Sequence, residues 1–250
     1  QYSDGVERIN IELSLRNKIS LCDELLRFFD RGHLPLGKAQ EIDDLASPEQ
    51  LQEHVTRASH LIAEVRGLWQ SWLDQFDLLF PQLQSHVLRA SWKTQIRTEL
   101  QNIFTGEIFQ PILQECENIH QRVLKGRVWA ALHAHAGDGN VHINIPVNSD
   151  DYAMLQTAHE AVGRIMQLAR SLDGVISGEH GIGITKLDYL TDQELEPFAR
   201  YKQQVDPNGH FNRGKLLRLP DPSKNTRAAD LSDAYTPSFG LMGHESLIMQ

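Results

Sequence analysis

The residues with the clearest chemical potential in this 250-residue chain are two histidines on either side of a glycine-rich turn, in the stretch HAGDGNVH from His135 to His142. An Asp-Gly pair between two β-like runs is typical of a two-residue hairpin turn, whose central residues need positive φ. With Asp138 and Gly139 as the loop, His135 lies directly opposite His142, with Cβ atoms about 4.5–5.5 Å apart. Two imidazoles at that distance on a rigid turn suit a divalent metal ion.

Glu179 is the candidate for a third ligand, because zinc and similar ions take imidazole nitrogen and carboxylate oxygen, and catalytic sites typically use three protein ligands. His180 follows it directly and is placed to act as a general base. His133 is expected on the same face of the hairpin, opposite Asn144, as a half-buried structural histidine. A His-His pair also occurs as an ordinary packed β pair, so spacing alone leaves the metal site and the structural pair both open.

The glycines that flank this carboxylate, Gly178, Gly181 and Gly183, lack the spacing of a dinucleotide-binding fingerprint. We expect them to permit close approach of the backbone to a ligand or substrate. Lys186 is expected to be solvent-exposed. The stretch DPNGHFNRGK from residue 206 to 215 is dominated by turn residues and by itself predicts only the exit from a helix.

The first half of the chain is predicted to be helical. One helix is expected from Val6 to Phe29, one from Ser47-Pro48-Glu49 to a stop at Pro81, and a further helical stretch from Leu83 to Val123. Aromatic residues recur at helical spacing on the second of these helices: Trp69, Trp72, Phe76 and Phe80. Such a stripe is more often ordinary core than a docking surface.

The second half changes character and must position the candidate site. Two strands surround the Asp-Gly turn, and they are followed by a helix capped by Ser149, a short strand and a helix opened by the capping pair Thr191 and Glu194. The expected ranges are Arg127–Ala136, Val141–Val147, a helix end near Gly174, a strand over Gly174–Ser177 and a last helix end before Pro207. The chain is therefore predicted to be α+β, with a small antiparallel, ferredoxin-like sheet covered by helices. The predicted divisions are a helical region over 1–124, the metal and substrate domain over 125–218, and a linker over 219–250 toward a following domain.

Composition excludes several classes of protein. The net charge of −9 argues against a nucleic-acid surface, and no apolar run approaches the ~18 residues of a membrane span. Cys22 and Cys116 are far apart, which fits a reducing, cytoplasmic setting and excludes a cysteine-ligated cluster within this chain. The chain starts with Gln1, after which the sequence is polar and has no signal-peptide pattern; we expect it to be a piece of a longer polypeptide.

Three segments taken together, HAHAGDGNVH, SGEHGIGITK and VDPNGHFNRGK in this order, resemble the C-terminal substrate domain of FAD-linked oxidases of the D-lactate dehydrogenase, glycolate oxidase and D-2-hydroxyglutarate dehydrogenase type. The resemblance covers about residues 127 to 217. It implies oxidation of a 2-hydroxy acid, with a divalent metal, most simply zinc, and FAD as cofactors. It implies these roles: His135, His142 and Glu179 as metal ligands, His180 as base, Asn144 as a substrate contact, and Asn212, Gly214 and Lys215 near the flavin.

The chain also departs from that family. Arg213 stands where the family usually has proline, and the Lys-x-Asp-x-Ser-x-Pro segment that grips the substrate carboxylate is missing, so Arg97 is the nearest basic candidate for that role. The flavin-binding domain has no counterpart here, and the isolated chain is expected to be inactive. The helical first half resembles large multidomain bacterial members, which implies an iron–sulfur module downstream; the electron acceptor is not implied.

Two other functions fit the same residues. A metal-dependent hydrolase would use the His-His-Glu set to activate water, and it would act without flavin. A docking domain would present the stripe of Trp69, Trp72, Phe76 and Phe80 to a neighbouring protein.

Overall fold

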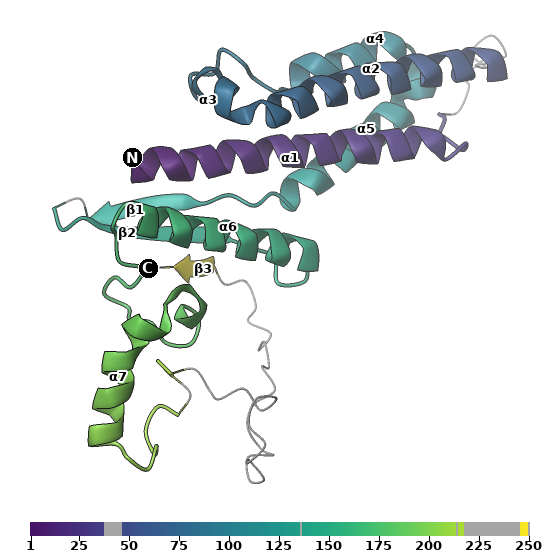
Figure 1. The fold of residues 1–250 in the computed structure, drawn as a ribbon. Coiled ribbons are helices and arrows are strands. Elements are labelled where there is room, and N and C mark those ends of the chain that lie inside the picture. Colours follow the sequence, from purple (N-terminus) through teal and green to yellow (C-terminus); the bar gives the residue numbers. More distant parts are fainter. Residues whose placement is uncertain (38–46, 136, 214, 218–245, 250) are drawn as a thin grey trace. The chain divides into compact units, whose positions relative to one another are not determined.

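The chain forms two compact units, which divide between Ala130 and Ala131. The computed structural model describes residues 1–37, 47–135, 137–213, 215–217 and 246–249 (Figure 1). The first unit is helical, and the second combines helices with a small antiparallel sheet. The prediction of an α+β chain is therefore confirmed. None of the helices in the described part combines the length and the apolarity that crossing a bilayer requires.

The first unit consists of helices around one apolar core. Its elements are α1 (Tyr2–Asp30), α2 (Pro48–Asp74), α3 (Phe76–Gln84), a π-helical turn (Lys93–Arg97), α4 (Thr98–Ile103), a 3₁₀ turn (Glu107–Phe109) and α5 (Gln110–Lys125). The largest fully buried side chains include Trp69, Phe104, Leu25, Ile62 and Ile112. These residues come from three of the helices and from the end of α4, so the core joins segments that are distant in sequence.

The start of α2 follows the sequence prediction, whereas its end does not. Ser47 caps the helix, and its side chain and that of Gln50 each accept a backbone N–H of the other residue. The helix is interrupted at Gln75, where φ is −105° and ψ is 25°, and Pro81 lies inside α3 rather than at a stop. The predicted helical stretch from Leu83 to Val123 is also broken, because Gly106 adopts a φ of +104° between α4 and α5.

The aromatic stripe on α2 and α3 contributes to this core. Trp69 and Phe76 are buried, and Trp72 and Phe80 are partly buried and pack against the core. The guanidinium of Arg8 lies over the rings of Phe76 and Phe80, at 5.2 and 4.8 Å from their centroids. Packing within the unit thus explains the aromatic stripe. The stripe leaves little exposed surface on which another protein could dock.

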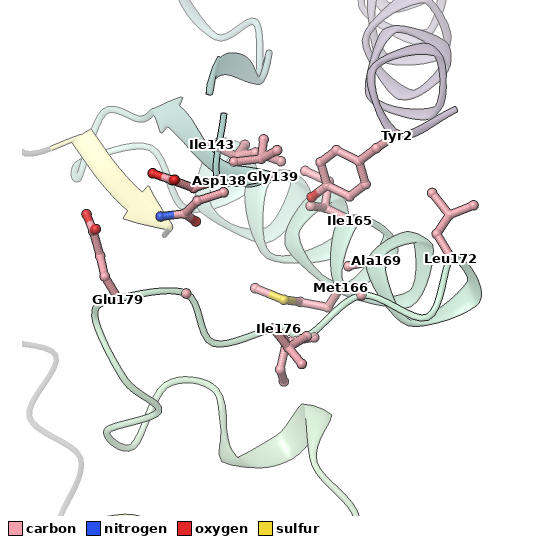
Figure 2. Close-up of a pocket in the computed structure, with 15 residues that line it drawn as sticks. Tyr2, Asp138, Gly139, Ile143, Ile165, Met166, Ala169, Leu172, Ile176 and Glu179 are labelled. Carbon is pink, nitrogen blue, oxygen red and sulfur yellow. The ribbon is translucent and has the colours of Figure 1, made fainter. Parts of the chain in front are cut away.

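The second unit contains a three-stranded antiparallel sheet in the order β1-β2-β3. Its elements are β1 (Ala131–His135), β2 (Asn140–Pro146), α6 (Tyr152–Ser171), a 3₁₀ turn (Leu187–Tyr189), α7 (Asp192–Val205) and β3 (Ser246–Met249). Side chains from β2 and α6, among them Ile143, Ile165 and Met166, line one hollow (Figure 2). The predicted linker 219–250 falls mostly outside the described residues, but Ser246–Met249 pair with β2 as β3.

Side chains cap the N-terminal ends of α6 and α7. Thr191 and Glu194 form the predicted capping box of α7, whereas α6 is capped by Asp151, which accepts the Met154 N–H at 3.0 Å, and not by Ser149. The strand predicted over Gly174–Ser177 is wrong. This stretch is irregular, and Val175 is 84% exposed, because the chain leaves α6 through Asp173 at a φ of +58°.

Candidate metal centre

The hairpin that carries the two histidines has a longer loop than the sequence predicts. Residues 136–139 separate the strands, and His135 pairs with Asn140 instead of His142. The Asp138 N–H donates to the His135 carbonyl at 3.0 Å, and Gly139 has a φ of +68°, whereas Asp138 keeps a negative φ. A two-residue turn of the predicted type needs positive φ at both central residues. The predicted opposition of His135 and His142 is therefore wrong.

The two imidazoles nevertheless face each other. The register differs from the predicted one by two residues, and a strand repeats its facing every two residues, so both side chains stay on the same face. They are now diagonal neighbours, which aromatic side chains can bridge. The ring centroids of His135 and His142 lie 4.9 Å apart at 81°. The residue directly opposite His142 is His133, and Asn144 faces Ala131, which corrects the predicted pairing of His133 with Asn144.

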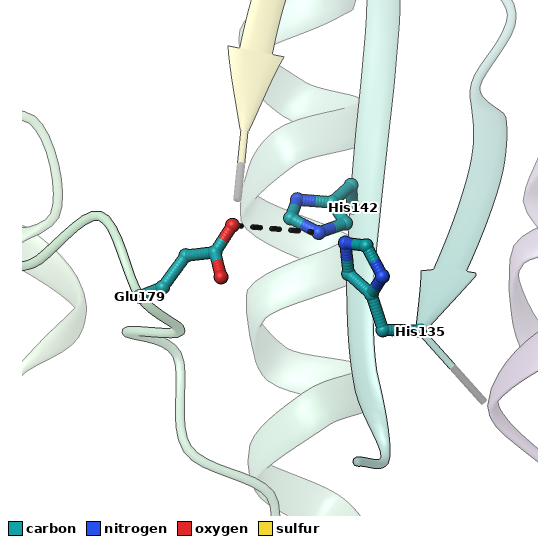
Figure 3. Close-up of side chains that lie close together, drawn as sticks. All are labelled: His135, His142 and Glu179. Atoms are coloured by element: carbon teal, nitrogen blue, oxygen red, sulfur yellow. Dashed lines mark ion pairs between the residues drawn. The ribbon is translucent and has the colours of Figure 1, made fainter. Parts of the chain in front are cut away.

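Glu179 reaches the histidine pair from the loop that follows α6. Figure 3 shows its carboxylate pointing at the two rings, with Oε1 3.9 Å from Nε2 of His142. One donor atom from each of His135, His142 and Glu179 lies within 4.8 Å of the other two. Three side chains that are up to 44 positions apart (179 − 135) are thus brought together, two from a hairpin and one from an irregular loop.

The most informative feature of the site is the burial of the His142 side chain. His142 is buried, and neither Nδ1 nor Nε2 has a hydrogen-bond partner among the described residues. Buried polar groups are normally paired, and an unpaired one costs about 1–3 kcal/mol. By contrast His135 is exposed and the Glu179 side chain is 57% exposed, so the site is open on one side. A cation would satisfy one of the two nitrogens of the buried imidazole, and the donor set of two imidazoles and one carboxylate fits zinc.

His180 and Asn144 lie around these three residues. The His180 Nε2 lies 3.2 Å from the Glu179 Oε1, and its ring is 6.2 Å from that of His142. Asn144 lies two residues beyond His142 on the same face of β2, and its Oδ1 is buried without a hydrogen-bond partner among the described residues. The predicted base and the predicted substrate contact therefore lie beside the candidate ligands.

The segment predicted to lie near the flavin is tied to the glycine-rich loop. The Leu216 N–H donates to the Gly183 carbonyl at 3.0 Å, which brings the neighbouring Lys215 to this loop. Asn212 has a φ of +45° and its carbonyl accepts the Lys215 N–H. The side chains of both residues are exposed, and Gly214 lies outside the described residues.

Asp206 organises the turn that precedes this segment. Its carboxylate accepts hydrogen bonds from the Lys202 Nζ at 2.7 Å and from the N–H groups of His210 and Phe211 at 2.8 and 3.0 Å. These bonds, with the ammonium of Lys202 first, lower the pKa of Asp206 to about 2. The predicted helix exit is therefore a turn built on one carboxylate.

Two further residues differ from, or add to, the sequence predictions. Lys186 is only 8% exposed, so the expectation of a solvent-exposed lysine is wrong, and burial lowers the pKa of its ammonium. No signal in the local sequence distinguishes it from a surface lysine. Arg97 lies in the π-helical turn of the first unit, with its Nε 3.8 Å from a carboxylate oxygen of Glu117.

Comparison with known proteins places the site in a family. Residues 111–216 match the family described as FAD linked oxidases, C-terminal domain. The glycolate oxidase subunit GlcD of Escherichia coli K12 is 39% identical over 87 residues, which cover 33% of this chain and 17% of that protein. The probable mitochondrial D-lactate dehydrogenase of Danio rerio is 31% identical over 101 residues, 39% of this chain and 20% of that protein.

A third relative is the D-2-hydroxyglutarate dehydrogenase of Stutzerimonas stutzeri, 36% identical over 89 residues, which cover 33% of this chain and 19% of that protein. The chain thus spans only about a fifth of the length of these relatives. No solved structure matches it. The matched region includes most of α5, the hairpin, the Glu179 loop and α7, and it contains all three candidate ligands. The segment 111–216, which is less than half of the chain, therefore matches the C-terminal domain of the FAD linked oxidases.

Proposed function

We propose that this chain supplies the divalent-metal and general-base part of the active site of an FAD-linked oxidoreductase that oxidises a D-2-hydroxy acid. The observation that carries the proposal is the convergence of His135, His142 and Glu179, with donor atoms within 4.8 Å of one another. Both ring nitrogens of His142 are buried there and have no hydrogen-bond partner among the described residues. The family match supports it, and the names of the relatives specify D-lactate, glycolate and D-2-hydroxyglutarate, all of which are 2-hydroxy acids.

The metal and the flavin supply the electrophilic and redox chemistry: a bound divalent cation polarises the substrate hydroxyl as a Lewis acid, and a flavin accepts the hydride. His135, His142 and Glu179 would hold the cation, and three protein ligands leave room for the substrate. Zinc is the metal that we propose, because imidazole nitrogen and carboxylate oxygen are among its usual donors.

His180 would remove the proton from the substrate hydroxyl. A base must reach that proton, and His180 lies beside the ligand Glu179, 3.2 Å from its Oε1, with its side chain 53% exposed toward a substrate. The contact with Glu179 also orients the ring. Asn144, whose Oδ1 has no hydrogen-bond partner in the described part of the chain, would accept a hydrogen bond from a substrate hydroxyl on the same face of β2.

The remaining roles are proposed for residues outside the ligand set. Asn212, Gly214 and Lys215 would lie near the flavin, a role supported by the bond between Leu216 and Gly183 that ties the end of this segment to the Glu179 loop. Arg97 would bind the substrate carboxylate in place of its present partner Glu117. The flavin itself would be carried by a part of the protein outside this chain, so we expect the chain alone to bind metal without turnover.

Elemental analysis tests the ligand set. Wild-type chain purified and equilibrated with Zn²⁺ is expected to retain about one ion per chain, whereas Glu179→Ala and His142→Ala lose it. His159→Ala is the matched control, because His159 is an exposed histidine on α6. Unchanged metal content in both ligand variants would refute the assignment.

The same samples distinguish the oxidoreductase from the metal-dependent hydrolase. A hydrolase acts on phosphoester or amide substrates without flavin, and its activity would disappear in Glu179→Ala. Oxidation of 2-hydroxy acids by the protein with its flavin, together with no hydrolysis by this chain, supports the proposal.

A further inference from the structure

Asn140 lies next to all three candidate ligands without belonging to them. It opens β2, and the strand register places it directly opposite His135. It precedes His142 by two residues and therefore shares its face of the strand. Its side chain also meets the loop that carries Glu179, at the residue just before that ligand. Asn140 therefore lies where the hairpin and the loop come together beside the site.

Gly178 has no room for a side chain on the side that faces Asn140. A Cβ atom placed on Gly178 would lie 2.8 Å from Oδ1 of Asn140, 3.6 Å from its Cγ and 3.7 Å from its Nδ2. Real Cβ contacts essentially never fall below 3.0 Å, so a side chain at position 178 requires either Asn140 or the loop to move.

The requirement at Gly178 concerns space and not backbone conformation. Gly178 does not have a positive φ, whereas Gly181 and Gly183 adopt φ of +74° and +57°, and nothing lies within 4 Å of the point that a Cβ atom would occupy on either of them. The two kinds of glycine in this loop therefore have different roles. Gly181 and Gly183 let the backbone turn, whereas Gly178, which has no side chain, lets the loop pass close to the Asn140 amide.

Apart from the burial of Ile176, few contacts of the described residues hold the Glu179 loop against β2. The stretch from Val175 to Gly181 contains no helix or strand in the described structure, and it holds a turn at Glu179 and His180. The contacts of Glu179 itself are with His142 at 3.9 Å and His180 at 3.2 Å, both at the site. The limited space between Gly178 and Asn140 therefore contributes to where the loop crosses the end of β2.

We infer that Asn140 is a positioning residue for the metal centre. Its side-chain amide limits how closely Gly178 approaches β2, and this places the Glu179 carboxylate within reach of His135 and His142. The inference rests on the proposed metal site and adds a residue that is not a ligand. Residues that orient metal ligands typically change metal affinity about tenfold to a hundredfold when they are removed.

A double-mutant cycle on Zn²⁺ affinity tests the inference, with the affinity of this chain measured by competition with a chromophoric chelator. Asn140→Ala and Gly178→Ala are each expected to weaken binding at least about tenfold. In the double variant the methyl group at 178 enters space that the amide has vacated. We therefore expect the double variant to bind within about threefold of Asn140→Ala, far from the product of the two single losses.

Controls separate positioning from general damage. Asn148→Ala removes an asparagine just beyond β2, and Gly163→Ala adds a methyl group on α6 where nothing lies within 4 Å; neither is expected to alter Zn²⁺ affinity. Thermal melting in excess chelator is the second readout, and it should move little in Asn140→Ala, because that residue is only partly buried.

Each outcome is decisive. Wild-type affinity in Asn140→Ala, or losses that simply multiply in the double variant, would overturn the positioning role while the metal site stands. Absence of Zn²⁺ binding by the wild-type chain would overturn the proposed function together with this role.

Discussion

Replacing His142 by leucine should have opposite effects with and without metal. Neither ring nitrogen of His142 has a hydrogen-bond partner among the described residues, and the side chain is buried. A neutral imidazole presents one N–H donor and one acceptor nitrogen. Leaving a buried group of this kind unpaired costs about 1–3 kcal/mol, and an apolar side chain of similar size removes that penalty.

The magnitude follows from these two terms. In excess chelator, removing the unpaired group should stabilise His142→Leu by about 1–3 kcal/mol, and the lost ring contact with His135 should cost about 0.5–1.5 kcal/mol. The variant is therefore expected to be more stable than the wild type by about 1 kcal/mol, within a range from about −0.5 to about 2.5 kcal/mol. At a free Zn²⁺ concentration of about one hundred times Kd, the wild type should gain about 2.7 kcal/mol by linkage, and the variant should gain almost nothing. The order of the two stabilities should therefore reverse when the metal is added.

The probe must report on the second unit. All four tryptophans lie between Trp69 and Trp129, in the first unit, so intrinsic fluorescence follows the wrong part of the chain. Amide hydrogen exchange at Ile143 and Ile145, which are buried in β2, measures the stability of the sheet directly. His159→Leu on α6 is the matched control, and its stability should stay within about 0.5 kcal/mol of the wild type in both conditions.

The reasoning fails if His142→Leu is clearly less stable than the wild type in chelator, because His142 would then have a structural partner. It also fails if the variant gains as much stability from Zn²⁺ as the wild type does. Either result would remove the observation on which the proposed metal site rests.

Three other predictions concern the fold. The pKa of Asp206 is lowered from its ordinary value of 3.8 to about 2 in the folded chain, so the stabilising contribution of its carboxylate is complete above pH about 4 and disappears as the pH falls through about 2. Protection of the Phe211 amide against hydrogen exchange should fall over this range, and Asp206→Asn should remove that dependence on pH. The pKa values of the Cys22 and Cys116 thiols are raised to about 12, mainly by burial, so little reactive thiolate is present at pH 8. Mass spectrometry should therefore detect no alkylation by iodoacetamide at this pH until the chain is unfolded in urea. Trp69 is fully buried, and Trp69→Ala should lower the free energy of unfolding of the first unit by about 3–5 kcal/mol in urea titrations followed by circular dichroism; a loss below about 1 kcal/mol would contradict its place in the core.

The sequence was sufficient wherever the determining chemistry is local. The helix start at Ser47, the capping pair of Thr191 and Glu194 and the presence of a hairpin around Asp138-Gly139 follow from short-range hydrogen bonding and turn geometry, and the structure confirms them. The prediction that His135 and His142 share one face of the hairpin is also confirmed, although the predicted register was wrong. A register error of two residues leaves every side chain of a strand on the same face. Alternation along a strand is therefore a safer guide to a site than the exact pairing.

Tertiary structure decided the features that depend on contacts between distant segments. The longer loop of the hairpin, the interruption of the long helix at Gln75 and the burial of Lys186 each depend on packing that no short window contains. The contact of Asn140 with Gly178 joins residues 38 positions apart (178 − 140), and its meaning appears only when the space around a glycine is known. The sequence identifies side chains able to bind a metal, whereas only the folded chain shows what holds them together, because that depends on volumes and distances and not on residue types.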